Sequence, residues 1–267
     1  MVRRVPIGWR IAGTALTILT LVFILAPLVV VVGVSVSTSQ FISFPPVGFS
    51  LRWYRAILES DDYLGSAWTS LELALLVTAA ATVLGGAAAV VIHRRRLVGT
   101  AVMSALLLSP LVLPTIVLAI GLLMLWSRTV GTVSFTALWL GHTVVALPYV
   151  VRTTLASLAD CDPYIEEAAR TMGAGRIARL RHAVLPQCAP GLAAGAFFAF
   201  NISFDEAILA LFLRTPDITT LPIQIYNQIE FSPDPTVAAV STLMIGVTVL
   251  LMAIIDRLLG LQRLTEH

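Results

Sequence analysis

The sequence contains no lysine, and all 17 of its basic residues are arginine. A phosphate-binding P-loop needs a lysine, and so does covalent catalysis through a lysine Schiff base, so this chain supports neither. Charged residues make up only 12% of the chain, whereas soluble proteins usually carry about 25%. No polar stretch is long enough to form a separate soluble domain.

Cysteine and histidine are also rare. Cys161 and Cys188 are not closely spaced, and both fall on the cytosolic side of the topology deduced below, so we expect reduced structural thiols. The histidines are scattered: His93, His142, His182 and His267. None has a metal-ligand spacing, which leaves His142 as a helix-packing or pore-lining group. We predict no metal site and no catalytic residues.

Hydrophobic sequence dominates the chain. Apolar residues make up 58% of it, and the mean hydropathy of +0.92 indicates a polytopic membrane protein. Six runs are each about long enough to cross the hydrocarbon core as a helix. They cover residues 11–36, 67–92, 101–126, 133–151, 188–213 and 236–255. We predict an all-α fold in one transmembrane domain, 1–267, with a five-span core over residues 67–258.

The amino-terminal segment has some features of a signal peptide. A short basic stretch with Arg3, Arg4 and Arg10 precedes an apolar run. A cleavable signal has an apolar region of about 7–15 residues, whereas this run extends from 11 to 36. We therefore expect the first span to be retained.

Residues 37–66 are polar and aromatic, and Pro45-Pro46 interrupts any helix there. Further on, Ser50 is suited to cap a short helix. One face of that helix would carry Leu51, Tyr54, Ile57 and Leu58. Aromatic residues here favour the membrane interface, so we predict an external segment with an interfacial helix.

The arginines are distributed unevenly between the two sides of the predicted spans. With the amino terminus inside, the inner segments contain Arg3, Arg4, Arg10, Arg94, Arg95, Arg96, Arg152, Arg170, Arg176, Arg179, Arg181, Arg257 and Arg263. The outer segments contain Arg52, Arg55, Arg128 and Arg214. The positive-inside rule then predicts that both termini and segment 160–186 are cytosolic.

Segment 160–186 lies between two predicted spans but carries too many charges to enter lipid. Asp162 is suited to cap a helix with Pro163 at its first position. Gly173 and Gly175 can adopt the left-handed conformation that ends a helix, and a basic segment follows. These features predict two short helices in an amphipathic hairpin at the membrane surface.

The residue pattern of this segment is more specific. Glu167-Ala168-Ala169, three residues, Gly173 and nine residues lead to Ala183-Val184-Leu185-Pro186. The spacing resembles the EAA loop of ATP-binding cassette (ABC) importer permeases, with Ala183 in place of the usual isoleucine. The resemblance implies a type I ABC importer permease fold whose loop docks into a groove on a separate ATPase subunit. It implies ATPase-coupling roles for Glu167, Ala168, Ala169, Gly173, Leu185 and Pro186.

Other segments resemble the spermidine/putrescine branch of these permeases. They are PPVGFSLRWY (45–54), NISFDE (201–206), LRTP (213–216), TLPIQIY (220–226) and DPTVAAVSTL (234–243). The resemblance implies an inner-membrane, non-enzymatic subunit that forms the pathway for a small solute such as spermidine or putrescine. Permeases for phosphonates and other small solutes, such as amino-acid derivatives, share these segments and remain an alternative.

The same resemblance implies several partners. They are a second permease subunit, two cytosolic ATPases that bind the ATP and Mg, and an extracytoplasmic solute-binding protein. No cofactor is expected in this chain, and no nucleic-acid partner.

Three carboxylates lie within the predicted spans, at similar depth in the outer part of the membrane: Glu72, Asp205 and Glu206. A charge at the membrane centre costs about 2.5–3.5 kcal/mol on insertion scales, so such groups usually face protein or water. They are interpreted as helix–helix or snorkelling groups, or as an anionic substrate pathway in which Asp205 is favoured. An ion-coupled secondary transporter that uses Glu72 or Asp205 is the alternative class.

Overall fold

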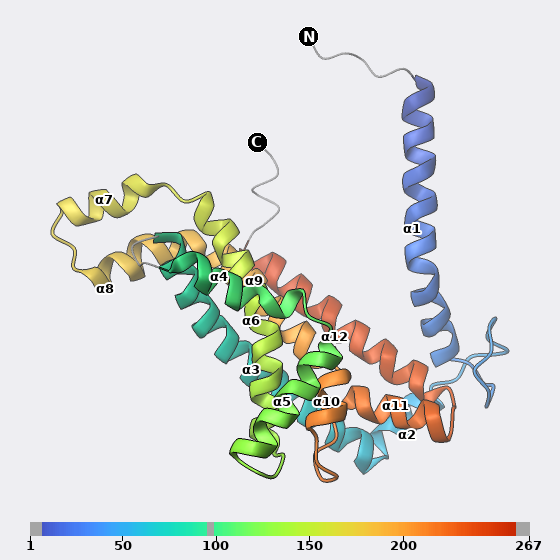
Figure 1. Ribbon diagram of the computed structural model, residues 1–267. Helices are drawn as coiled ribbons and strands as arrows, with labels where there is room; N and C mark the ends of the chain where they lie inside the picture. Colours follow the sequence, from blue (N-terminus) through green and yellow to red (C-terminus); the bar gives the residue numbers. More distant parts are fainter. Residues whose placement is uncertain (1–6, 95–98, 260–267) are drawn as a thin grey trace. The chain divides into compact units, whose positions relative to one another are not determined.

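The computed structural model describes residues 7–94 and 99–259 (Figure 1). Every regular element within these residues is a helix, as predicted. The α-helices are α1 (Ile7–Ser35), α2 (Arg52–Leu58), α3 (Asp61–Arg94), α4 (Thr100–Leu108), α5 (Thr115–Thr129), α6 (Phe135–Ala159), α7 (Pro163–Thr171), α8 (Arg176–Arg179), α9 (Leu185–Asp205), α10 (Ile208–Leu213), α11 (Leu221–Phe231) and α12 (Thr236–Leu259). A 3₁₀ turn, η1 (Ser109–Leu111), follows α4, and a π-helical turn, η2 (Leu180–Val184), joins α8 to α9.

The chain divides into two compact units. The first comprises Met1–Asp61 and Ile225–Val247, and the second comprises Asp62–Gln224 and Thr248–His267. Helices α1 and α2 belong to the first unit, and α4 to α10 belong to the second with nearly all of α3. Some residues that entered the predictions lie outside the described ranges: Arg3, Arg4, Arg95, Arg96, Arg263 and His267.

Four helical runs are long and apolar enough to cross a membrane: Ile7–Ser35, Asp61–Arg94, Arg176–Asp205 and Thr236–Arg257. Two bent pairs pass the same test together. They are Thr100–Leu111 with Thr115–Thr129, bent by 108°, and Phe135–Ala159 with Pro163–Thr171, bent by 74°. If each bent pair is one span, the described residues contain the six spans that hydropathy predicts.

Two of the predicted spans differ from the observed helices by an internal break, whereas the others differ only in where they begin and end. The span predicted over 101–126 is broken between η1 and α5, because Pro110 and Pro114 cannot donate helical hydrogen bonds. The span predicted over 188–213 ends at Asp205, and α10 is separate. That span also begins earlier, because the second arm of the hairpin is not a separate short helix but continues through η2 into α9.

Helix α2 forms where the sequence predicts an interfacial helix, but its apolar face was only partly predicted. Ile57 is buried, whereas Leu51 and Leu58 are exposed. The indole of Trp53 donates a hydrogen bond to the carbonyl oxygen of Ser37 at 2.9 Å. Within the first unit, this bond ties α2 to the residues that follow α1.

Helices α6 and α9 approach closely within the second unit, and the approach depends on glycine. A Cβ atom at Gly191 would lie 2.6 Å from the carbonyl oxygen of Thr153, and one at Gly195 would lie 2.9 Å from the Cα of Val150. Small residues at such a contact let two helix backbones meet. Val150 also belongs to the buried apolar core of this unit. The hairpin of α7 and α8 therefore extends from the ends of two closely packed helices (Figure 1).

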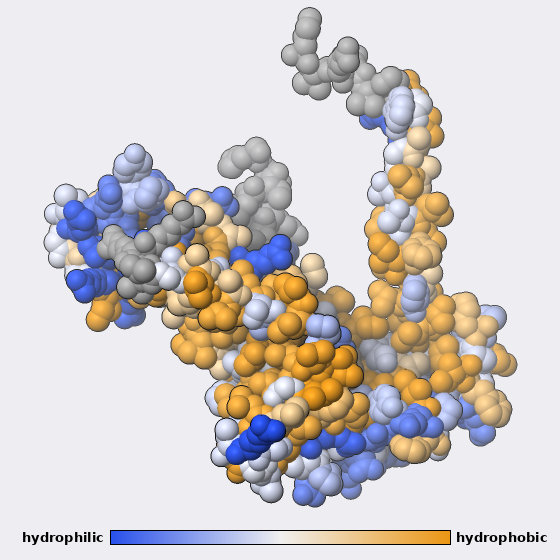
Figure 2. Space-filling view, in the orientation of Figure 1, coloured by the Kyte–Doolittle hydropathy of each residue, from blue (hydrophilic) through white to orange (hydrophobic). Residues whose placement is uncertain are grey.

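The surface of the second unit changes in polarity along its length. Large apolar side chains are exposed over the spans, among them Val83 at 70%, Val112 at 86% and Leu125 at 59%. The end formed by α7 and α8 is largely hydrophilic (Figure 2). This distribution is expected when the spans lie in lipid and the hairpin lies in water.

Candidate functional site

The first arm of the hairpin, α7, begins as the sequence predicts. The backbone N–H of Tyr164 donates to Oδ1 of Asp162 at 2.9 Å, so Asp162 is the N-cap. Pro163 occupies the first helical turn, where its missing N–H is not needed. Glu166 lies in the first turn, where the helix dipole favours a negative charge.

The turn after α7 is a Schellman motif. Gly173 has φ 83°, and its N–H donates to the carbonyl oxygen of Arg170 at 3.0 Å. The N–H of Ala174 donates to the carbonyl oxygen of Ala169, also at 3.0 Å. These are the two bonds that define the motif, and its central residue needs a positive φ. Gly173 therefore has the predicted conformation, whereas Gly175 has φ −64° and does not.

The predicted coupling residues lie at two places on the hairpin. Glu167, Ala168 and Gly173 are exposed on α7 and its turn, with Ala169 partly buried. Leu185 and Pro186 are exposed at the start of α9. The structure thus leaves most of the predicted set free to meet a partner.

The hairpin also exposes large apolar side chains that the sequence pattern did not single out. Tyr164 is 73% exposed, Met172 is 88% exposed and Ile177 is 81% exposed. Contiguous exposed apolar surface marks protein interaction sites, whereas single exposed apolar residues are common on any protein. A signal was available in the sequence, because all three lie in a segment too charged for lipid.

The root of the hairpin is held by a small apolar cluster. Val184, Leu158 and Cys188 are buried there with Ala89 of α3. Ala183, the residue that replaces isoleucine in the sequence pattern, is only 3% exposed. The smaller side chain is therefore still packed at this position.

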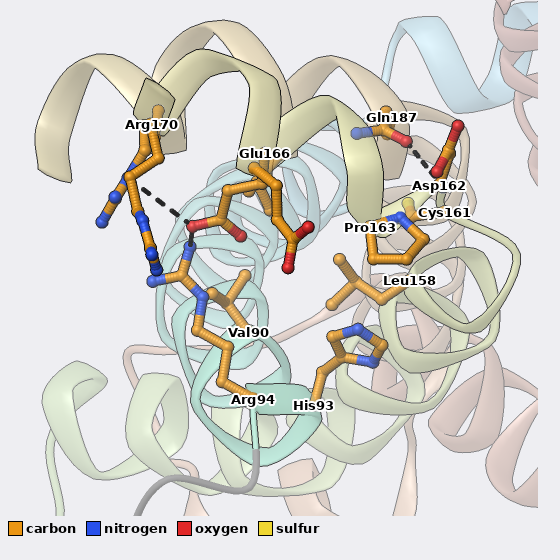
Figure 3. A pocket seen from close by; sticks show the side chains of 13 residues that line it. Val90, His93, Arg94, Leu158, Cys161, Asp162, Pro163, Glu166, Arg170 and Gln187 are labelled. Atoms are coloured by element: carbon orange, nitrogen blue, oxygen red, sulfur yellow. Dashed lines mark hydrogen bonds and ion pairs between the residues drawn. The ribbon is translucent and has the colours of Figure 1, made fainter. Parts of the chain in front are cut away.

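A cavity of about 240 Å³ lies above this cluster, between the end of α3 and the two arms of the hairpin (Figure 3). Nη2 of Arg94 lies 2.8 Å from Oε1 of Glu166, and Nε of Arg179 lies 3.8 Å from the same oxygen. The backbone N–H of Asp162 donates to Oε1 of Gln187 at 3.0 Å. Sequence reasoning missed this ion-pair cluster, since 72 residues separate Arg94 from Glu166.

The three predicted pathway carboxylates belong to the second unit, far from the hairpin. Glu72 precedes Arg94 by 22 residues on α3, and Asp205 follows Arg179 by 26 residues, which is roughly 33 and 39 Å of helix. Within this single chain, the side chains of Glu72 and Asp205 are exposed, whereas that of Glu206 is partly buried. Both spans thus carry a carboxylate in the half remote from the hairpin.

Glu206 has a structural role that the sequence did not reveal. Its Oε1 accepts hydrogen bonds from the backbone N–H of Ile208 at 2.8 Å and of Leu209 at 3.2 Å. These amides open α10, so the carboxylate caps that helix. The Glu206 side chain therefore stabilises the break between Asp205 and α10. A hydropathy pattern registers Glu206 only as a charged residue and does not reveal this capping role.

The remaining polar candidates are structural. His142 is 1% exposed, and its Nδ1 lies 3.2 Å from Oγ of Ser203, which joins α6 to α9 and favours the helix-packing interpretation. Cys161 and Cys188 are both free thiols. Burial, with a contribution from the Asp160 carboxylate, raises the pKa of the Cys161 thiol and so disfavours its reactive thiolate. No cluster of metal-ligating side chains occurs among the described residues.

Known proteins resemble this chain over most of its length. The chain matches the family described as binding-protein-dependent transport system inner membrane component over residues 81–262. The spermidine/putrescine transport system permease protein PotC of Escherichia coli is 31% identical over 89% of this chain and 89% of its own. The putrescine transport system permease protein PotI of the same species is 30% identical over 89% of this chain and 86% of its own.

Solved structures share the fold at lower identity. One is a bacterial ABC transporter involved in the import of the acidic polysaccharide alginate, with a TM-score of 0.69, 15% identity and coverage of 95% of this chain and 98% of that chain. Another is the MetNI methionine ABC transporter, with a TM-score of 0.62 and 20% identity. The match covers 75% of this chain and 97% of that chain.

Proposed function

Because the chain belongs to the family of binding-protein-dependent transport system inner membrane components, we propose that it forms the membrane pathway of an ATP-driven polyamine importer. It is an inner-membrane permease subunit of an ABC transporter, and ATP hydrolysis belongs to a separate subunit of such transporters. The observation that carries the choice of substrate is the identity of 31% and 30% to permeases named for spermidine and putrescine.

The hairpin of α7 and α8 supports the coupling part of this proposal. The hairpin combines the charged Glu167 with the exposed Met172 and Ile177, which suits insertion into a groove of an ATPase subunit. The second arm continues into the membrane as one run, Arg176–Asp205. Movement of the hairpin, driven by ATPase closure, would therefore be carried along α9 toward Asp205 and would switch the spans between inward-open and outward-open states.

The proposed assembly contains further subunits. A second permease subunit completes the pathway, two ATPases bind the ATP and Mg, and an extracytoplasmic binding protein delivers the solute. A bacterial alginate ABC transporter has been solved in complex with a periplasmic protein bound to an alginate pentasaccharide, which supports delivery by a binding protein in this class. Both termini of this chain are proposed to be cytoplasmic, on the same side as the hairpin.

The carboxylates supply the chemistry for a polycation. Glu72 and Asp205 lie in membrane-spanning helices, yet no part of the chain that the structure describes buries their side chains. A charge at the membrane centre costs about 2.5–3.5 kcal/mol on insertion scales, and charged groups within spans usually face protein or water. A water-filled pathway or a partner subunit is therefore the favourable surrounding for these carboxylates. Fixed negative charge there would offset the desolvation of a polyamine and raise its local concentration.

Reconstitution tests the proposed function. The chain, its second permease subunit and the ATPases are placed in vesicles, and the binding protein is added with labelled putrescine or spermidine. Uptake is expected to require ATP, the binding protein and the ATPases, and vesicles without the ATPases are the control. Uptake that continues without ATPases and follows an ion gradient would instead identify a secondary transporter. A binding protein that selects a phosphonate over polyamines would reject the polyamine.

The proposed topology predicts a retained, cytoplasmic amino terminus. Mass spectrometry of the mature protein should detect peptides from residues 1–10, and a tag placed there should resist protease added outside the cell. The physical reason is the length of α1, whose 29 residues exceed the apolar region of a cleavable signal. A mature chain beginning near Thr38 would show that the first span is removed.

A further inference from the structure

Helix α7 is held in place by very little apolar packing. None of its residues is buried, and the apolar cluster at the hairpin root contains residues of α3, α6 and the α9 region but none of α7. The cavity of about 240 Å³ lies between α7 and this cluster, and residues of both line it. Polar contacts must therefore fix where α7 sits relative to the spans.

Glu166 makes the central contact of this kind. Its Oε1 is 2.8 Å from Nη2 of Arg94 and 3.8 Å from Nε of Arg179. Arg94 is the last residue of α3, and Arg179 is the last residue of α8, at the start of the run that becomes α9. One carboxylate thus connects the hairpin to the ends of two membrane spans, as the ion pairs drawn in Figure 3 show.

The contact is partly sheltered from solvent. The side chains of Arg94, Glu166 and Arg179 are 30%, 29% and 14% exposed. Nε of Arg179 is buried and has no hydrogen-bond partner within the described residues, so the Glu166 carboxylate is its electrostatic partner there. A sheltered carboxylate shared by two arginines holds its geometry better than a freely solvated surface pair.

The neighbouring residue is placed differently. Both Glu166 and Glu167 line the cavity, but Glu167 is exposed, whereas Glu166 is partly buried and forms the ion pair with Arg94 (Figure 3). Glu167 belongs to the surface proposed to meet the ATPase, and Glu166 faces the permease itself.

We propose that Glu166 is a positioning residue that links the hairpin through Arg94 and Arg179 to α3 and α9, so that hairpin movement is passed to both spans. The inference rests on the proposed role of the hairpin in ATPase coupling. Without this link, the hairpin still reaches the ATPase through its exposed surface. Movement of α7 is then absorbed in the cavity instead of reaching α3, and only the second arm, which is continuous with α9, still moves a span.

The test uses the complete transporter with Glu166→Gln and Arg94→Gln, and Arg152→Gln as the matched control. Arg152 is an exposed arginine of α6 that does not line the cavity. Both test variants should still co-purify with the ATPases, while the solute transported per ATP hydrolysed falls roughly fivefold, at the lower end of typical coupling between sites. The control should keep the wild-type ratio.

A second measurement is independent of the transported solute. Hydrogen exchange of α7 amides in the assembled transporter should accelerate in Glu166→Gln and Arg94→Gln and stay unchanged in Arg152→Gln. The exchanged pair Glu166→Arg with Arg94→Glu should recover at least part of both signals, because it restores one ion pair.

The outcomes separate this inference from the proposed function. Unchanged transport ratio and unchanged α7 exchange in both single variants would overturn the link. Loss of assembly in the single variants with no recovery in the exchanged pair would show that these residues serve folding alone. A wild-type complex that transports no polyamine would reject the proposed substrate, while the exchange measurement would still test the link.

Discussion

Replacing Gly173 with valine is expected to abolish most of the transport that depends on the ATPases while leaving insertion into the membrane intact. Gly173 has φ 83° in the turn between the two arms of the hairpin. A left-handed conformation costs an ordinary residue roughly 1–2 kcal/mol, and a β-branched residue more. No atom lies within 4 Å of a Cβ added there, so the strain comes from the backbone alone. Stimulated ATPase activity and co-purification measure the effect.

Gly175→Ala is the matched control for this prediction. Gly175 lies two residues away, also has open space around an added Cβ, and has φ −64°, which any residue adopts. The control should assemble and transport like the wild type. Equal behaviour of the two variants would mean that the turn geometry does not matter for coupling, and normal transport in Gly173→Val would remove the hairpin from the proposed ATPase contact.

Neutralising Asp205 is expected to lower polyamine uptake on the order of tenfold, which corresponds to about 1.4 kcal/mol. Asp205 is the last residue of α9, and its side chain is exposed within this chain. Asp205→Asn removes the negative charge with little change in side-chain volume. A polycation that enters the membrane then loses one fixed counter-charge. Uptake into vesicles, corrected for the amount of assembled transporter, measures the effect, and substrate-stimulated ATPase activity should weaken with it.

Two companion variants make this result interpretable. Asp217→Asn removes an exposed carboxylate from the loop between α10 and α11, outside the spans, and should change uptake little. Glu206→Gln removes a carboxylate that caps α10, so its effect mixes charge with local stability. Glu72→Gln should add to the loss in Asp205→Asn. Unchanged uptake in all three pathway variants, singly and together, would reject the anionic pathway without affecting the family assignment.

Local features of the hairpin were predictable because they depend on residues within one helical turn. Asp162 caps α7 through an amide two residues away, and Gly173 supplies the positive φ that a Schellman turn needs. Such interactions are encoded in short windows of sequence. For the same reason, the spacing from Glu167 to Pro186 was enough to indicate an ABC permease loop.

The sequence by itself determined that this chain is an all-helical membrane protein with a charged hairpin near its middle. Run lengths, arginine distribution and cap residues carry that information, because each reports on solvent or on near neighbours in the chain. The tertiary structure alone decided that Glu166 meets Arg94 and that α6 approaches α9 at Gly191. It also decided that the fifth predicted span ends at Asp205. These features depend on partners that are distant in the sequence, or on whether a helix is capped or continues. The hydropathy pattern of one chain carries no information on either.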